Sequence, residues 1–195
     1  MKSRCFCGPA IALSCMAMLA VAAQATTVFN GGFETGDLTG WTLTNSSVFD
    51  AVCQAGNPIG AATCIVHSGN YAMSLGHAGG VTTLSQSLAT TPGVMYNLEF
   101  YLANDNPSDV GVETFQVLWD GTSVYSLSSP QPSFPYTLVS LDVTAATNST
   151  TLSFLAQQDP SQWFLDDVSI QTIPEAATIL TLASGLVALG LARRR

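Results

Sequence analysis

The stretch YNLEFYLA, residues 96–103, alternates between two kinds of side chain. Its even-numbered positions hold Tyr, Leu, Phe and Leu, whereas its odd-numbered positions hold Asn, Glu, Tyr and Ala. Because successive side chains of a β-strand point to opposite faces of the sheet, this pattern predicts a strand with one face in a hydrophobic core. The face that carries Glu99 and Tyr101 would then point away from that core.

The same alternation recurs on both sides of this stretch. It is present at residues 71–75, 81–88, 115–119, 124–127, 139–143, 152–156 and 163–170. Asp120-Gly121, between two of these segments, is a strong hairpin signal. Many short strands separated by turns, with no helical periodicity between residues 26 and 172, predict one all-β sandwich domain over that range.

The last alternating segment, WFLDDVSI at residues 163–170, contains two adjacent carboxylates. A regular strand would place Phe164, Asp166, Val168 and Ile170 on one face. Asp166 and Asp167 are therefore expected to point in opposite directions.

The first 25 residues have the composition of a secretory signal peptide. Lys2 and Arg4 precede an apolar run, and Ala-Gln-Ala at residues 23–25 has the form of a cleavage site. We therefore expect export of the chain and cleavage after Ala25.

The segment 173–195 has three parts, namely Pro174-Glu175, an uncharged run at 176–192 and a basic end formed by Arg193, Arg194 and Arg195. As a helix the run would reach roughly 25 Å, at the low end of what spans the ~30 Å apolar core of a bilayer. Terminal arginines favour the cytoplasmic side, so this transmembrane helix would leave the domain outside.

This order of parts resembles the PEP-CTERM sorting signal of bacterial exosortase substrates. Ala176 stands where that signal has its second proline. The resemblance implies processing by an exosortase, transient anchoring in the inner membrane, and a final place at the cell surface or in the extracellular matrix. A plain C-terminal membrane anchor is the alternative interpretation.

The charge is distributed unevenly along the chain. All five basic residues lie in the two terminal segments, whereas the middle holds twelve of the thirteen acidic ones. A domain without Lys or Arg repels nucleic acid, which needs cations to displace its counterions. It also repels anionic lipids and phosphorylated ligands, tolerates neutral sugars and attracts Ca²⁺.

Two cysteines, Cys53 and Cys64, stay in the chain after removal of the signal peptide. In an exported protein their spacing predicts a disulfide. A metal site is the poorer interpretation, because His67 is the only further ligand nearby.

Three stretches, NGGFETGDLTGW at 30–41, HSGNYAMSL at 67–75 and FLDDVSI at 164–170, resemble jelly-roll carbohydrate-binding modules of the galactose-binding-like superfamily. The resemblance implies a structural Ca²⁺ that joins the first segment to the last strand. Its side-chain ligands would be Glu34 and Asp166, and its backbone carbonyl ligands would come from near Gly32 and from residues 68–70, including Asn70. The alternative is that both carboxylates are solvated in turns.

A sugar site needs an aromatic surface beside hydrogen-bonding side chains. Glu99 and Tyr101 share the outward face of one strand, Gln116 is expected beside them on another strand, and Trp163 lies at a junction between a loop and a strand. We therefore predict that these four residues bind a glycan. Core packing is the better explanation for most of the other aromatics, namely Trp41, Phe33, Phe100, Trp119 and Phe154.

No motif of a catalytic nucleophile, metalloprotease or phosphate-binding loop is present in the sequence. The sequence therefore predicts an exported, non-enzymatic surface or matrix protein that associates with exopolysaccharide or another neutral glycan. A structural or adhesive surface protein without a specific glycan ligand is the alternative.

Overall fold

The computed structural model describes residues 27–60, 62–105, 111–129 and 131–174, which contain twelve β-strands and no helix. The strands are β1 (Thr42–Thr44), β2 (Ala51–Gln54), β3 (Pro58–Ile59), β4 (Ala62–Thr63), β5 (Tyr71–Leu75), β6 (Thr82–Ala89), β7 (Met95–Asn104), β8 (Val112–Trp119), β9 (Thr122–Ser128), β10 (Phe134–Thr144), β11 (Ser149–Asp159) and β12 (Trp163–Thr172).

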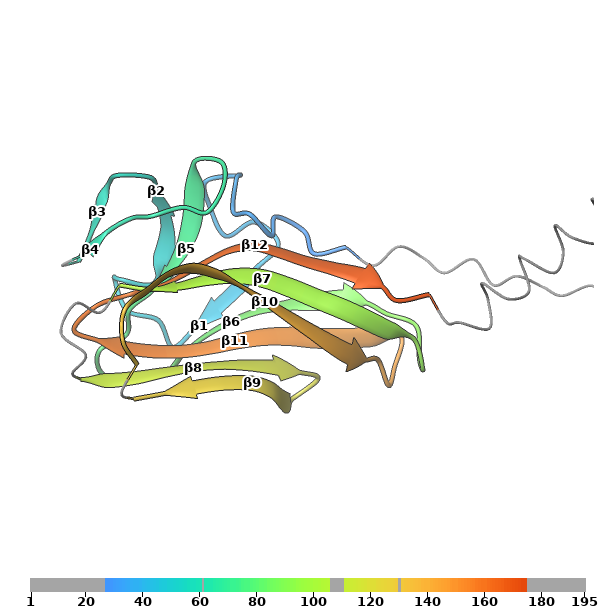
Figure 1. Ribbon diagram of the computed structural model, residues 1–195. Helices are drawn as coiled ribbons and strands as arrows, with labels where there is room; N and C mark the ends of the chain where they lie inside the picture. Colours follow the sequence, from blue (N-terminus) through green and yellow to red (C-terminus); the bar gives the residue numbers. More distant parts are fainter. Residues whose placement is uncertain (1–26, 61, 106–110, 130, 175–195) are drawn as a thin grey trace, which may run out of the picture.

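Ten of these strands form two five-stranded antiparallel sheets packed face to face (Figure 1). Sheet A has the order β1-β6-β11-β8-β9, and sheet B has the order β10-β7-β12-β5-β2. The remaining two strands, β3 and β4, pair as a small hairpin. This architecture confirms the predicted all-β jelly-roll sandwich.

The strand β7 behaves as its sequence predicts. Tyr96, Leu98, Phe100 and Leu102 are fully buried between the sheets, whereas Asn97, Glu99 and Tyr101 are half-buried on the outer face of sheet B. Aromatic rings from both sheets meet in this core, and the centroids of Phe100 and Phe154 lie 5.3 Å apart. Burial of one face of each sheet is what holds the two layers together.

The strand β12 departs from the predicted alternation. Its pairing with β7 shifts between Asp166 and Ser169, and Asp167 adopts a φ of 48°. Because of this bulge, residues on both sides of it face the same core cluster. Trp163 and Leu165 precede the bulge, and Val168 and Ile170 follow it. Phe164 belongs instead to a separate cluster outside sheet B. The prediction that Phe164 and Asp166 share a face with Val168 and Ile170 is therefore wrong.

The chain between residues 42 and 64 contains four short strands that the sequence pattern did not predict. They are two to four residues long, too short for alternation to be visible. The disulfide Cys53–Cys64 predicted from spacing is present and is confirmed. It closes the segment that carries the β3–β4 hairpin.

The signal peptide at 1–25 and the apolar run at 176–192 lie outside the described residues, as do Glu175 and the three terminal arginines. The part of the chain that the structure describes contains no helix able to cross a membrane. The predicted domain boundaries and sorting signal stay predictions.

Candidate functional site

The residues predicted to bind calcium come together between the first loop, the 67–70 turn and β12. Asp166 is fully buried, and its Oδ2 accepts hydrogen bonds from the backbone N–H of His67 at 2.8 Å and of Ser68 at 3.2 Å. Glu34 Oε1 accepts from the backbone N–H of Asn70 and of Tyr71, both at 2.9 Å. The two carboxylates therefore accept hydrogen bonds from one continuous stretch of backbone, residues 67–71.

Gly32 leaves space among three carboxylates. A Cβ atom at this position would lie 3.2 Å from Asp167 Oδ1, 3.7 Å from Glu34 Cγ and 3.8 Å from Asp166 Oδ1. Oxygen donors without a nearby Lys or Arg suit Ca²⁺, so the residues fit the predicted ion. Within the described ranges, however, no three His, Cys, Asp or Glu side chains form a ready-made metal-binding group. The calcium ion stays a prediction.

The bulge in β12 brings Asp167 to the same candidate calcium site. Its Oδ2 lies 2.6 Å from His67 Nδ1, and its Oδ1 accepts from Ser68 Oγ at 2.8 Å. Asp166 and Asp167 therefore both reach the 67–68 turn, contrary to the prediction that they point apart. The predicted carbonyl of Asn70 accepts the N–H of Ala55 at 2.9 Å.

Burial raises the pKa of Asp166 to about 6, partly offset by the N–H groups of His67 and Ser68. Because this folded-state pKa exceeds the unfolded value of 3.8, the metal-free protein should become more stable as the pH falls from 7 to 5. We expect the melting temperature to rise by about 5 °C over that range, and added Ca²⁺ to give its largest gain at pH 7. Asp166→Asn should remove both effects, as measured by thermal melts in calcium and in EGTA.

A melting temperature that is the same in calcium and in EGTA at pH 7 would exclude the ion. If the melting temperature of Asp166→Asn shows the same pH dependence as wild type, another carboxylate is the cause of that dependence. Comparison with the variant is needed because Asp50 and Glu113 are also buried.

Tyr101 is covered by the 67–68 turn. The imidazole of His67 stacks on its ring with centroids 3.4 Å apart, and Tyr136 meets His67 edge-on at 5.6 Å. Burial, followed by the charges of Asp166 and Asp167, raises the pKa of Tyr136. The face of the Tyr101 ring that a sugar would need is therefore occupied.

This cluster does not have the geometry of a serine triad. Both His67 and Ser68 bond to the carboxylate of Asp167, so the Ser68 hydroxyl donates its proton to the acid and not to the imidazole. A nucleophilic serine needs the reverse, with its hydroxyl bonded to the base.

The four residues predicted to bind a glycan do not form one site. Gln116 lies on the outer face of sheet A, where its Nε2 donates to Ser123 Oγ at 3.0 Å, whereas Glu99 and Tyr101 lie on the outer face of sheet B. The prediction failed because β7 and β8 are consecutive in sequence but belong to different sheets.

Trp163 is fully buried, which makes the prediction that it stacks on a sugar wrong. Its ring centroid lies 5.6 Å from that of Phe115 and 6.1 Å from that of Phe134, and its Nε1 donates to the carbonyl of Gln157 at 3.1 Å. It is a core residue, because the first residue of β12 faces inward.

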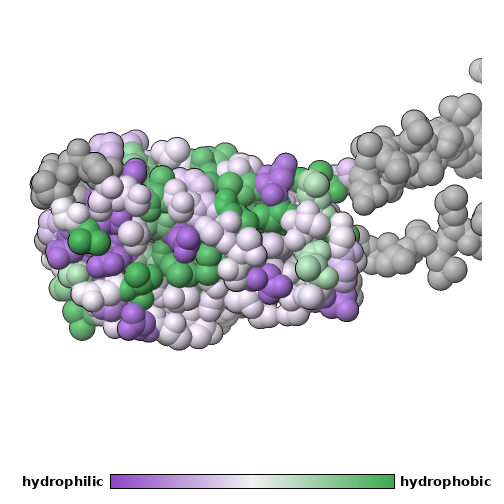
Figure 2. All heavy atoms as spheres, turned by 90° about the horizontal axis from the view of Figure 1, so that it is seen from below, coloured by the Kyte–Doolittle hydropathy of each residue, from purple (hydrophilic) through white to green (hydrophobic). Residues whose placement is uncertain are grey.

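The side of the molecule where β8 and β9 lie has a mixed polar and apolar surface. Figure 2 shows this side as mostly pale, weakly hydrophilic atoms with apolar patches between them. The outward residues of β8, β9 and β11 there include Gln116, Ser126 and Leu155, which line a shallow hollow.

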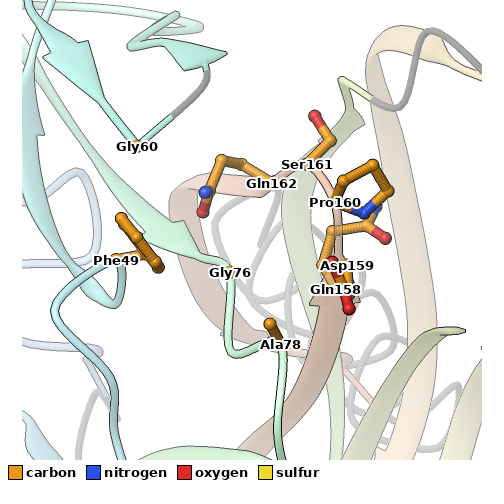
Figure 3. A pocket seen from close by; sticks show the side chains of 9 residues that line it. All are labelled: Phe49, Gly60, Gly76, Ala78, Gln158, Asp159, Pro160, Ser161 and Gln162. Atoms are coloured by element: carbon orange, nitrogen blue, oxygen red, sulfur yellow. The ribbon is translucent and has the colours of Figure 1, made fainter. Parts of the chain in front are cut away.

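A different cavity, of about 370 Å³, opens at the end of the sandwich where β11 turns into β12. Its lining consists of Phe49, Gly60, Gly76, Ala78 and the turn 158–162. Figure 3 shows Phe49 on one side of the opening and the turn on the other, with the side chain of Gln162 reaching between them. We refer to it as the end cavity.

One residue that lines the end cavity, Gln158, has an unsatisfied buried oxygen. Gln158 is fully buried, and its Nε2 donates to Asn104 Oδ1 at 2.6 Å, but its Oε1 has no hydrogen-bond partner. An unpaired buried acceptor costs about 1–3 kcal/mol, and because this oxygen is itself shielded from solvent it is not open to a ligand in the cavity.

Gln162 provides a second side-chain amide at the end cavity. Its Oε1 accepts from Ser74 Oγ at 2.9 Å, and we find no acceptor for its amide nitrogen among the described residues. A Cβ at position 76 would overlap this amide, which explains the glycine there. Phe49, with 37% of its surface exposed, adds an apolar ring to the mouth of the cavity.

The disulfide segment forms one wall of the end cavity. Gly60, between β3 and β4, lies against Phe49, where an added Cβ would approach the ring to 2.9 Å. Cys53 and Cys64 pack with Phe164 in the small cluster that covers the outer face of sheet B. The bridge therefore holds the hairpin that supports this wall.

The sequence patterns missed the cavity entirely. Phe49 lies in an irregular stretch, and Gln158 and Gln162 flank the turn at Asp159-Pro160. The one available signal was the polar sequence QQDPSQ at 157–162 between two strongly alternating strands. It is typical of an ordinary turn and did not indicate a site.

No family model and no curated protein matches this chain. Solved structures do match. TmCBM61 in complex with beta-1,4-galactotriose has a TM-score of 0.53 at 21% identity, over 74% of this chain and 96% of that one. The CBM22-1 xylan-binding domain of Paenibacillus barcinonensis Xyn10C has a TM-score of 0.50 at 13% identity, over 80% and 98%.

A cyclase from Fischerella sp. TAU has a TM-score of 0.55 at 16% identity, over 78% of this chain and 98% of that one. The fold is therefore shared by carbohydrate-binding modules and by enzymes. At these identities the comparisons support the jelly roll, and the function has to be argued from the site.

Proposed function

We propose that this chain is an exported, non-enzymatic surface or matrix protein whose jelly-roll domain binds sugar units of exopolysaccharide that carry no anionic groups. The observation that carries the proposal is the end cavity, where the partly exposed ring of Phe49 lines the same opening as the amide of Gln162, whose nitrogen has no acceptor among the described residues. An apolar ring with a few fixed polar groups is what sugar recognition requires.

The position of the end cavity supports this function. β12 begins beside the cavity and runs for about 30 Å to Thr172. Figure 1 shows the first and last described residues at the opposite end of the sandwich from the β11–β12 turn. A protein attached through its C-terminal segment would therefore hold the cavity away from the point of attachment.

Charge and chemistry agree with a non-enzymatic role. The described residues contain no Lys or Arg, so they lack the permanently charged side chains that usually bind carboxylated, sulfated or phosphorylated sugars. The group formed by Ser68, His67 and Asp167 lacks the bond that activates a nucleophile. The exosortase and the inner membrane remain proposed partners through the segment 173–195, in which Pro174 and Glu175 would mark the processing site.

A panel of uncharged, amino and anionic oligosaccharides tests the proposal with the full chain purified in mild detergent. We expect binding of one or more uncharged or amino sugars with dissociation constants between micromolar and millimolar, and no binding of uronic acid or sulfated oligomers. If no oligosaccharide of the panel binds, the result would favour the alternative of a structural or adhesive protein without a specific glycan ligand.

A further inference from the structure

The end cavity has a free side-chain donor, the amide nitrogen of Gln162. This residue is only 3% exposed, and Ser74, which donates to its Oε1 at 2.9 Å, is fully buried. Its backbone is held as well, because its carbonyl accepts the N–H of Asp105 at 3.1 Å. In the part of the chain that the structure describes, Gln158 Oε1 is the one unpaired side-chain atom that is shielded from solvent. The unpaired nitrogen of Gln162 is therefore fixed in place and open to solvent.

The space in front of this nitrogen is kept free by Gly60. A Cβ atom at position 60 would lie 3.2 Å from Gln162 Nε2 and 2.9 Å from Phe49 Cδ1. Figure 3 shows the three residues around the same part of the opening. The amide nitrogen and the aromatic ring therefore face one small space, which any larger residue at position 60 would fill.

The other polar side chains of the lining are engaged or lie outside this space. Ser161 is buried, and its Oγ donates to the carbonyl of Asp105 at 2.8 Å. The free oxygen of Gln158 is shielded, and Asp159 is exposed to bulk solvent. Ala78 adds a methyl group to the lining. The cavity thus offers one N–H donor beside an aromatic ring.

A neutral carbonyl group that carries a methyl group matches this arrangement. A carbonyl oxygen accepts the N–H without bringing a proton that needs an acceptor of its own, whereas a hydroxyl brings one. A carboxylate would enter a lining that includes Asp159, with no Lys or Arg among the described residues to offset the charge. The methyl group gains by leaving water for the ring of Phe49.

Resting on the function proposed above, we propose that the end cavity selects N-acetylated sugars. The acetamido carbonyl accepts from Gln162 Nε2, the methyl group lies beside Gly60 against the ring of Phe49, and the acetamido N–H stays toward the mouth, where water accepts it. The cavity, of about 370 Å³, is at the low end of ligand pockets and suits one sugar unit of a longer chain. The partner is then a polysaccharide whose amino sugars are acetylated and uncharged.

The test compares β-1,4-linked trisaccharides of N-acetylglucosamine, glucosamine and glucose by calorimetry on the full chain in mild detergent at pH 7. We expect the acetylated trimer to bind about tenfold more tightly than the glucose trimer, because the acetamido group adds one hydrogen bond and one buried methyl group. Gln162→Met keeps the length of the side chain and removes the donor, while Ser74 Oγ can still donate to the carbonyl of Phe49 at 3.1 Å. This variant should bind the acetylated and glucose trimers within about threefold of each other.

Gly60→Ala and Gly56→Ala form a matched pair. Both glycines lie in the segment closed by the disulfide and have positive φ values, 59° and 79°, so both substitutions bring the same kind of backbone strain. An added Cβ at position 56 meets nothing within 4 Å, whereas one at position 60 fills the space beside Gln162. Gly60→Ala should weaken binding of the acetylated trimer about tenfold, and Gly56→Ala should leave it within twofold of wild type.

Three results would overturn this inference and leave glycan binding intact. They are equal binding of the acetylated and glucose trimers, tightest binding of the glucosamine trimer, and equal losses in the two glycine variants. N-acetylalanine methylamide that binds as tightly as the acetylated trimer would assign the cavity to a peptide and overturn it too. If all three trimers fail but another uncharged sugar of the wider panel binds, the N-acetyl preference alone is overturned; if no oligosaccharide binds, the proposed function falls with it.

Discussion

Trp163→Ala is expected to lower the free energy of unfolding by about 3–5 kcal/mol, the usual cost of a large cavity in a protein core. The indole is fully buried between Phe115 and Phe134, and its Nε1 donates to the carbonyl of Gln157. Truncation removes this packing and leaves that carbonyl without its donor. Urea denaturation of the full chain, followed by intrinsic fluorescence, measures the loss.

Two controls separate core packing from a surface role. Trp163→Phe keeps most of the ring volume and should cost less than half as much. Gln116→Ala, on the outer face of sheet A, should change stability by less than about 0.5 kcal/mol. A stable Trp163→Ala protein that loses glycan binding would show that the residue acts at the surface, contrary to the structure.

Phe49→Ala is expected to weaken glycan binding by about 10- to 100-fold with little change in stability, because aromatic anchors dominate binding energy and this ring is partly exposed. The effect should appear in the dissociation constant of whichever oligosaccharide binds best. A melting temperature within about 3 °C of wild type would show that the fold is intact.

Phe29→Ala provides a matched control for this variant. Phe29 is a second exposed phenylalanine, with 58% of its surface accessible, and it bonds to Gln86 only through its backbone. Its removal should leave binding within twofold of wild type. Equal losses in both variants, or none in Phe49→Ala, would place the sugar elsewhere than the end cavity.

The bulge at Asp167 shows how one local feature overrides an otherwise clear pattern. Alternation through WFLDDVSI predicted one face for Phe164, Asp166, Val168 and Ile170. A single residue in the left-handed region reverses the alternation after Asp166. As a result the two carboxylates reach the same turn, and a candidate calcium site gains a third acid.

The candidate sites differ in how far the sequence could locate them. Glu34, Asp166 and Gly32 were identified from short motifs, and the structure brings them together. Gln116 and Tyr101 were grouped by strand alternation alone, which gives the face of a strand but not its sheet. The end cavity depends on Phe49 and Gln162, which are more than one hundred positions apart and meet through the pairing of β5 with β2 and β12.

The sequence by itself determined the strands from β5 to β12, the hairpin at Asp120-Gly121, the disulfide and the acidic character of the domain. These follow from a period of two, from turn chemistry and from charge, all of which are local properties. Only the tertiary structure decided which outward faces coincide, that His67 covers Tyr101, and that Phe49 and Gln162 line one cavity. The physical reason is that strand order and a single bulge, set by packing between distant segments, determine which side chains meet.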